Sequence, residues 1–375
     1  MKKIKILNVI SDTNIGGAGK CIITCCKNRN REKFDVSVVM PKDSLLKPEI
    51  EATGARVIEI DGLKDKSLDL SAITKIKKII KEEKPDIIHT HASLSAKIAA
   101  RLAGKCKIIY TKHCDFPIGS KYKYKIVRWI NKILNESVTD KIIATSEHAK
   151  ENLIKQGLSE NLIETVLNGT DGYVEIPESE KEELRKKYGI KDEIVVGYLA
   201  RVEELKGHKY LIEAAKIIKE EALETDKKFK FLIMGSGAYE ETCKQMVKEF
   251  GLEDMVIFTG FIKEVGQMLN IVDIQINASY LSETTCLALL EGMSLGIPAV
   301  ATKCGGTPKM ITDWENGLLV EKADSKALAD GIRMIIKDSE KFDVMKENSK
   351  QIFKERYTSK VYTENIEKIY ESMVK

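Results

Sequence analysis

Short apolar runs alternate with longer amphipathic stretches along the whole chain. In the first half, runs with the composition of buried strands lie at 4–10, 34–40, 55–60, 85–90, 107–111 and 141–145. Between most of them, apolar residues recur at helical spacing, as they do in 71–83. Strands that alternate with helices are typical of βαβ units, so the pattern predicts a parallel sheet.

The same alternation restarts after a segment at 166–189 that is first turn-rich and then charged. Further strand-like runs lie at 193–200, 228–235, 255–260, 272–279 and 297–302. We place a boundary near Asn168-Gly169, which predicts an α/β chain of two doubly wound, Rossmann-like domains, 1–170 and 171–358. Ligands of such folds bind at the carboxyl ends of the strands, so we expect the domains to face each other across a cleft. Residues 359–375 have the spacing of a C-terminal helix.

Composition narrows the class of protein. The 375 residues include 61 Lys and Arg against 57 Asp and Glu, a net charge of +4 that gives no indication of nucleic-acid binding. No apolar run reaches the roughly 18 residues that span a bilayer, and Asn8 and Asp12 interrupt the apolar start, which argues against a signal peptide. The eight cysteines form no C-x-x-C pair, so we expect reduced thiols in a cytoplasmic protein without a zinc site.

A glycine-rich segment that contains Gly16 and Gly17 joins the first predicted strand to the first helix. A nucleotide P-loop would need glycine at Asn14 and a hydroxyl at Cys21, and a dinucleotide fingerprint would need G-x-G-x-x-G, so both patterns fail. Two interpretations remain open. The backbone N–H groups approach an anion at a helix N-terminus, or the segment is a tight turn without a ligand.

Two cations, Arg201 and Lys206, follow a predicted strand of the second domain and precede a helix that starts near Gly207. Cations at the carboxyl end of a strand suit a diphosphate, although a solvated loop often contains such a pair as well. Gly235 and Gly237 follow the next strand. They permit either close approach of the backbone to a ligand or a simple turn.

Glu283 and Glu291 stand at the ends of an apolar run, separated by seven uncharged residues. Thr284 and Thr285 predict the N-cap of a helix over about 286–295, with Glu283 before it and Glu291 about 10 Å along it. The helix N-terminus between them can bind an anion, an order that matches the sugar, diphosphate and ribose of a sugar nucleotide. Taken alone, the spacing is better explained by pairing with the helix dipole and by a solvated helix face.

Taken together, the motifs resemble those of glycosyltransferase family 4, in the right order and over nearly the whole chain. They are Gly16-Gly17, NGTD at 168–171, AR…KG at 200–207, GSG at 235–237, E-x7-E at 283–291 with GMSLGIPAVAT after it, GG at 305–306 and ENGLLV at 315–320. The resemblance implies a GT-B fold with the donor on the second domain and the acceptor mainly on the first. It also implies a C-terminal helix packed on the first domain, and sugar transfer with retention and without a bound metal or other cofactor.

The resemblance further assigns roles to residues of the donor site. Arg201 and Lys206 would bind the diphosphate and stabilise charge on the leaving nucleotide in place of a metal. Glu283 would hold sugar hydroxyls beside the reacting carbon, and Glu291 the ribose hydroxyls. The same pocket would include Gly235, Thr284, Thr285 and Cys286.

In the first domain, the resemblance implies that Gly16 and Gly17 close over the phosphate. His113 matches the family's cleft histidine, which would bond to the donor sugar or to an acceptor oxygen. His89 and His91 lie at a strand end, where a metal would need a third ligand that we do not find in the sequence. We expect these two histidines to be structural or to lie on the acceptor side.

The chain departs from the family at two places. The family often has glycine and an aromatic residue or serine after the first glutamate, where this chain has Thr284, Thr285 and Cys286. It often has an acid a few residues after the Gly-Gly pair, where this chain has Lys309. The first difference leaves the identity of the sugar open, and the second alters a neighbouring ion pair.

Residues 119–135 carry a basic and an aromatic stripe. Lys121, Lys125, Arg128 and Lys132 share one face of a predicted helix, and Tyr122, Ile126, Trp129 and Ile133 form the stripe beside it. This pattern is typical of a helix that lies on a membrane surface, and equally of an amphipathic helix packed on its own domain.

The leading hypothesis is a retaining glycosyltransferase with a UDP-linked sugar donor and a glycan or lipid-linked acceptor of the cell envelope. The enzyme would work in the cytoplasm, either free or on the inner face of the membrane. A sugar-nucleotide 2-epimerase of the same fold and a non-catalytic nucleotide-sugar-binding subunit are the alternatives.

Overall fold

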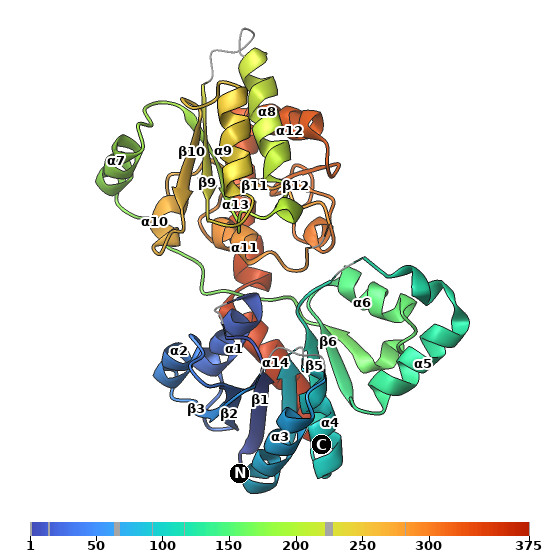
Figure 1. Ribbon diagram of the computed structural model, residues 1–375. Helices are drawn as coiled ribbons and strands as arrows, with labels where there is room; N and C mark the ends of the chain where they lie inside the picture. Colours follow the sequence, from blue (N-terminus) through green and yellow to red (C-terminus); the bar gives the residue numbers. More distant parts are fainter. Residues whose placement is uncertain are drawn as a thin grey trace. The chain divides into compact units, whose positions relative to one another are not determined.

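The computed structural model describes residues 2–13, 16–63, 68–91, 93–115, 117–221, 228–281 and 283–374. Contacts within the chain divide it into two compact units (Figure 1). Unit 1 comprises Met1–Asp171 and Arg356–Lys375, and unit 2 comprises Gly172–Glu355. Each unit has its own parallel sheet and its own core, as the restart of the strand pattern near residue 193 predicts.

The sheet of unit 1 has the order β3-β2-β1-β4-β5-β6-β7 within the described residues, and every pair of neighbouring strands is parallel. Its strands are β1 Ile4–Ile10, β2 Phe34–Pro41, β3 Arg56–Ile60, β4 Ile87–His91, β5 Lys107–Lys112, β6 Lys141–Ala144 and β7 Ile163–Thr165. Ile6 pairs with Val36 on one side and with Ile87 on the other. The order reverses between β1 and β4, which is where ligands bind in doubly wound sheets.

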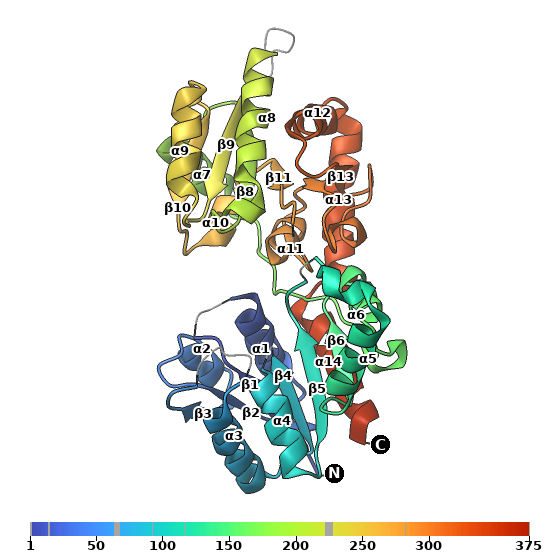
Figure 2. The same cartoon turned by 45° about the vertical axis from the view of Figure 1, so that its right-hand side comes forward.

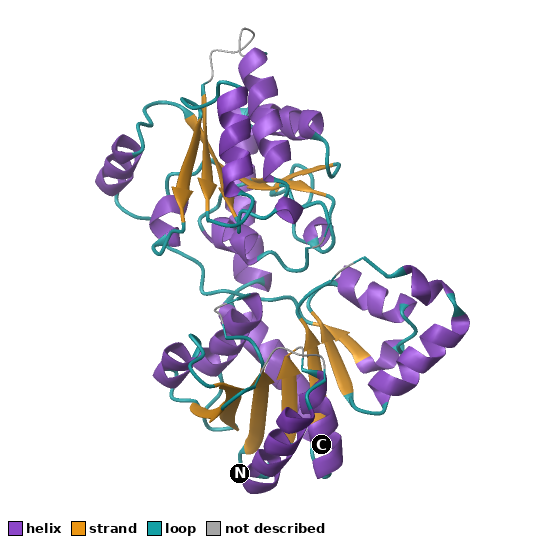
Figure 3. Cartoon of the chain, in the orientation of Figure 1, coloured by secondary structure: helices purple, strands orange, loops and turns teal. Residues whose placement is uncertain are grey.

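Helices cover both faces of this sheet (Figure 3). They are α1 Gly17–Asn28, α2 Lys47–Ala52, α3 Leu70–Glu83, α4 Leu94–Ala103, α5 Lys125–Glu136, α6 Glu147–Lys155 and α14 Ser359–Val374, with short 3₁₀ helices η1 Ser120–Lys123 and η2 Glu160–Leu162. Ile6 packs with α1, α2 and α14, whereas Leu7 packs with α3 and α4. Adjacent strand residues point to opposite faces, so both faces are buried and the strands are apolar throughout.

The C-terminal helix α14 lies beside α1 in unit 1 (Figure 2), as the resemblance implies. Tyr362, Ile366 and Ile369 are buried with α1, and the ring of Tyr370 lies 5.9 Å from that of Phe34. Before the helix, Thr358 pairs with Thr170 at a parallel bridge. The two segments of the chain that join unit 1 to unit 2 are therefore bonded to each other within unit 1.

The sheet of unit 2 has the order β10-β9-β8-β11-β12-β13 in the described part of the chain, so it repeats the winding of unit 1 and reverses between β8 and β11. Its strands are β8 Ile194–Leu199, β9 Phe229–Met234, β10 Val256–Gly260, β11 Ile274–Asn277, β12 Ala299–Thr302 and β13 Gly317–Val320. Its helices are α7 Glu178–Lys187, α8 His208–Glu220, α9 Glu240–Glu249, α10 Val265–Leu269, α11 Leu287–Ser294, α12 Ser325–Ile335 and α13 Ser339–Arg356, with η3 Glu204–Lys206 and η5 Thr307–Lys309.

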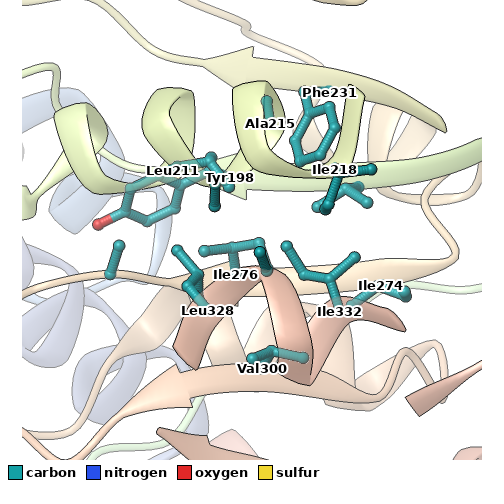
Figure 4. Packing of buried hydrophobic residues seen from close by; sticks show 14 of the residues in the cluster. Tyr198, Leu211, Ala215, Ile218, Phe231, Ile274, Ile276, Val300, Leu328 and Ile332 are labelled. Atoms are coloured by element: carbon teal, nitrogen blue, oxygen red, sulfur yellow. The ribbon is translucent and has the colours of Figure 1, made fainter. Parts of the chain in front are cut away.

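The larger core of unit 2 lies under α8 and α12. Figure 4 shows Leu211 and Ile218 of α8 facing Leu328 and Ile332 of α12 across the side chains of the strands, including Tyr198. Together the two sheets and their helices confirm the predicted class of two doubly wound α/β units. Strands β7 and β13 are absent from the prediction.

Candidate active site

The two predicted donor-binding cations both lie in the loop after β8, but in different surroundings. Arg201 is mostly exposed and pairs with Glu203, with Nη1 2.6 Å from Oε1. Lys206 ends the 3₁₀ helix η3, just before Gly207, whose φ of 72° begins α8. Its Nζ lies 2.9 Å from Oε2 of Glu283, and the two side chains are only 19% and 10% exposed. The fold thus brings together two predicted site residues that are 77 positions apart.

Further polar groups surround the Glu283 carboxylate. Its Oε2 also accepts hydrogen bonds from Ser279 Oγ at 3.0 Å and from Asn277 Nδ2 at 3.4 Å, both near the carboxyl end of β11. Desolvation opposes the charge on Lys206, but the Glu283 carboxylate raises the pKa of Lys206 above its ordinary value. The lysine therefore stays charged. Sequence reasoning missed Asn277 and Ser279, although their position at the end of a predicted strand is a signal.

The helix between the two glutamates starts later than predicted. Helix α11 begins at Leu287, and its N-cap is Cys286, with no side chain capping it. The prediction that Thr284 or Thr285 caps the helix was therefore wrong, because the backbone bends at these residues and is extended at Cys286. Glu291 lies within α11 and is 5% exposed, so it does not lie on a solvated helix face.

Glycines place the loops around Glu283. A Cβ on Gly305 would lie 1.9 Å from the carbonyl oxygen of Glu283, and Gly305 has a φ of 55°. The N–H of Gly306 donates to the same oxygen at 3.1 Å. Gly235, predicted at the donor site, has a φ of 140°, and a Cβ there would lie 2.1 Å from the Ala200 carbonyl. The structure thus uses Gly235 to pack the loops after β8 and β9 together.

The glycine-rich loop of unit 1 leads into α1. The N-cap of α1 is Gly16, which has no side chain that could cap the helix. No acidic residue lies in the first turn of α1. A Cβ on Gly17 would meet nothing within 4 Å. Residues 14 and 15 of the predicted loop lie outside the described residues. The N-terminus of α1 follows the carboxyl end of β1, at the reversal of strand order.

His113 belongs to a row of imidazoles at the carboxyl edge of β4 and β5. Its Nε2 lies 2.8 Å from Nδ1 of His91, whose Nε2 lies 3.1 Å from Oδ1 of Asn8. His89 lies beside His91, with ring centroids 4.3 Å apart, and hydrogen bonds to Tyr370. Desolvation lowers the pKa of His113 to about 4 and that of His89 to about 3, so both rings are neutral at pH 7.

The histidine row shows no arrangement for a metal. Among the described residues, no group of three or more His, Cys, Asp and Glu side chains is placed to hold a metal ion. His89 and His91 are buried, and their hydrogen bonds join β1, β4, β5 and α14. Asn8, which interrupts the first apolar run of the sequence, bonds to Nε2 of His91 through its side-chain oxygen.

The segment 119–135 is two elements rather than one helix. Lys121 and Tyr122 lie in η1, Tyr124 is extended, and α5 starts at Lys125. The prediction of a continuous helix was therefore wrong for its first turn. Helix α5 has no buried residue; its large apolar side chains are 45–62% exposed, namely Ile126, Trp129, Ile130, Ile133 and Leu134. None of the described helices combines the length and apolar character that crossing a membrane requires.

Two family models match the chain. The model described as Glycosyltransferase Family 4 matches residues 15–172, and the model described as Glycosyl transferases group 1 matches residues 180–352. The chain is a glycosyltransferase of the family 4 type. The two matches correspond closely to unit 1 without its C-terminal segment and to unit 2.

The names of similar proteins agree with the assignment to this family. The enzyme is 28% identical, over 80% of its chain and 78% of the relative, to N-acetyl-alpha-D-glucosaminyl L-malate synthase of Bacillus anthracis. It is 25% identical, over 99% of its chain and 98% of the relative, to the UDP-Gal:alpha-D-GlcNAc-diphosphoundecaprenol alpha-1,3-galactosyltransferase of Escherichia coli.

Solved structures share the fold of this glycosyltransferase. HepE from Anabaena, crystallised with UDP and glucose, superposes with a TM-score of 0.82 at 22% identity, over 98% of this chain and all of that one. Sucrose-phosphate synthase from Thermosynechococcus elongatus superposes with a TM-score of 0.78 at 19% identity, over 99% of both chains. These similarities confirm the predicted GT-B fold.

Proposed function

We propose that this glycosyltransferase moves a sugar, with retention of configuration, from a UDP-linked donor to a hydroxyl of a cell-envelope glycan or lipid-linked acceptor. The observation that carries the proposal is the Lys206–Glu283 pair at the carboxyl ends of β8 and β11, where the strand order of unit 2 reverses. A cation and a carboxylate at this point suit a ligand with both phosphates and hydroxyls.

In this proposal, donor binding redistributes the contacts of the pair. Lys206 and Arg201 bind the diphosphate, together with N–H groups at the start of α11. Glu283 accepts hydrogen bonds from the sugar hydroxyls, and Glu291 from the ribose. Thr284, Thr285 and Cys286 line the pocket between them. Gly16 and Gly17 keep their predicted role as phosphate-binding residues.

The chemistry assigned to these groups is stabilisation of the leaving nucleotide. Negative charge grows on the diphosphate as the bond to the sugar breaks, and a nearby ammonium and helix N-terminus stabilise that charge. We propose that they do so without a bound metal. His113, neutral at pH 7, serves as a hydrogen-bonding group for the donor sugar or the acceptor rather than as a cation.

The choice of UDP and of the acceptor rests on other proteins. HepE was crystallised with UDP, and the name of the E. coli relative gives UDP-Gal as donor and a diphosphoundecaprenol-linked sugar as acceptor. Another relative, CapM of Staphylococcus aureus, is named for capsular polysaccharide biosynthesis. By analogy we place this enzyme in polysaccharide biosynthesis, on the cytoplasmic side of the membrane.

We also propose that α5 lies on the membrane that holds the acceptor. Its apolar side chains are exposed beside Lys125, Arg128 and Lys132, which suits an anionic lipid surface. The test is sedimentation with phosphatidylglycerol vesicles. Trp129→Ala should weaken binding several-fold, whereas Trp314→Ala, which removes the half-exposed tryptophan of unit 2, should not. Equal binding by both variants would refute the membrane contact.

The experiment for the activity has two stages. Thermal shifts with UDP, GDP and ADP sugars identify the donor, because a ligand that binds the folded state raises its stability. Transfer from the radiolabelled donor is then measured with membrane-lipid extract, for the wild type, for Glu283→Gln and for Glu241→Gln, an exposed carboxylate on α9 that serves as control.

We expect Glu283→Gln to reduce transfer at least a hundredfold and Glu241→Gln to leave it unchanged. Transfer by Glu283→Gln at the wild-type rate would refute the site. Conversion of the donor into an isomer without any acceptor would instead identify a 2-epimerase. Tight donor binding without turnover on any extract would identify a non-catalytic binding protein.

A further inference from the structure

Unit 1 contains a buried carboxylate that the proposed mechanism does not use. Asp115 lies three residues beyond β5, and its side chain is only 1% exposed. Its Oδ2 lies 2.5 Å from Nδ1 of His148, and Asn152 Nδ2 lies 2.9 and 3.0 Å from its two oxygens. His148 and Asn152 are one turn apart on α6, so one face of this helix holds the carboxylate.

This arrangement determines which nitrogen of His148 carries the proton. A carboxylate accepts hydrogen bonds, so Nδ1 of His148 must donate to Asp115. In the neutral ring Nε2 is then an acceptor. The His148 side chain is 45% exposed, and within the described part of the chain its Nε2 makes no hydrogen bond. When the ring is neutral, the pair therefore presents Nε2 as an oriented acceptor nitrogen to solvent.

The pair lies at the edge of the sheet where ligands bind. Asp115 follows the carboxyl end of β5, and α6 follows the carboxyl end of β6. The N-terminus of α1 and His113 lie at the same edge, after β1 and β5. Ser146 caps α6 by accepting from Ala149 N at 3.1 Å, which stabilises the start of the helix that carries His148.

We propose that Nε2 of His148 accepts a hydrogen bond from a hydroxyl group of the acceptor substrate, and that Asp115 is the positioning residue that fixes the ring. The ligand class is a neutral, polyhydroxylated sugar, because a neutral imidazole nitrogen accepts from O–H groups and does not attract anions. The inference rests on the proposed function, since it names the acceptor side of the same reaction. The competing explanation is that Asp115 and His148 form a charged pair that only holds the segment after β5 against α6.

The first experiment measures steady-state transfer from the UDP-sugar donor to a panel of p-nitrophenyl glycosides. His148→Phe should raise the acceptor KM about tenfold, the effect of losing one hydrogen bond to the substrate, while the dissociation constant for UDP stays unchanged. His148→Gln should recover part of the loss, because its Oε1 also accepts. Glu151→Gln, an exposed change on the same helix, is the control.

The second experiment reads the tautomer directly. The full chain has five histidines, so ¹⁵N-histidine labelling gives few signals, and the signals lost in His148→Gln assign this residue. We expect the Nδ1–H form in the wild type and a loss of that preference in Asp115→Asn. Asp115→Asn should raise the acceptor KM to the extent that it lowers the population of the Nδ1–H form. A purely structural role of Asp115 would not link these two quantities.

Two results would overturn the inference. One is an Nε2–H tautomer in the wild type, and the other is an unchanged acceptor KM in a folded His148→Phe variant. Failure of the wild type to transfer sugar to any acceptor would count against the proposed function itself, and the inference would fall with it. The tautomer measurement needs no acceptor, so the two failures can be told apart.

Discussion

A buried histidine lies next to the loop that carries Lys206, and its protonation should control the stability of unit 2. His208 is fully buried at the start of α8 and stacks on Tyr198, with ring centroids 4.6 Å apart. The Tyr198 hydroxyl donates to the backbone carbonyl of Lys206 at 2.5 Å. Desolvation lowers the pKa of His208 to about 4, against a smaller opposite effect from the backbone of Glu203.

The direction of the pH dependence follows from this lowered pKa. The unfolded chain binds the proton near the ordinary pKa of 6.5, whereas the folded chain binds it only near 4. Stability is therefore complete above pH 6.5 and is lost as the pH falls toward 4. Each unit of pKa difference is worth about 1.4 kcal/mol, so full protonation of His208 lowers the free energy of unfolding by about 3 kcal/mol. About 2 kcal/mol of this loss has occurred by pH 5.0.

The assay compares the wild-type residue with His208→Phe in urea unfolding at pH 7.5 and 5.0. The chain has two tryptophans, Trp129 in unit 1 and Trp314 in unit 2, so a Trp129→Phe background makes fluorescence report unit 2 alone. Phenylalanine keeps the stacking on Tyr198 and cannot be protonated. We expect the histidine protein to lose about 2 kcal/mol more than the phenylalanine protein on acidification. Equal losses would refute the reasoning.

The remaining predictions concern the donor site and α5. Lys206→Met should lower the free energy of unfolding of unit 2 by about 3 kcal/mol, because it leaves the Glu283 carboxylate buried without its cation. The double variant with Glu283→Gln should recover most of that loss in the same urea assay. Gly305→Ala should abolish UDP binding measured by calorimetry, since its Cβ would collide with the Glu283 carbonyl. Gly189→Ala is the matched control, with a φ of 64° and nothing within 4 Å, and should bind UDP normally. Sedimentation with anionic vesicles should weaken at least threefold between 50 and 500 mM NaCl if α5 makes the contact, because salt screens the attraction.

The sequence alone predicts the class of fold well. The strands from β1 to β6 and from β8 to β12 appear as apolar runs because parallel strands that are buried on both faces have no polar alternation. The boundary near residue 168 appears because turn and charged residues interrupt that rhythm. Periodicity fails at 119–135, where helical spacing continues through Tyr124 although the backbone there is extended. Strands β7 and β13 were missed, and length alone does not explain this, since β6, β11 and β12 also have four residues and were predicted.

The candidate site is determined only by tertiary structure. The motifs identify Lys206 and Glu283 separately, but the 2.9 Å contact between them depends on the adjacency of β8 and β11, which are far apart in the chain. The same holds for Asn8 with His91 and for Asp115 with His148. Residue types and local spacing encode elements, because backbone propensity and burial act over a few residues. Which side chains meet depends on the order of strands in the sheet, a property of packing over the whole unit.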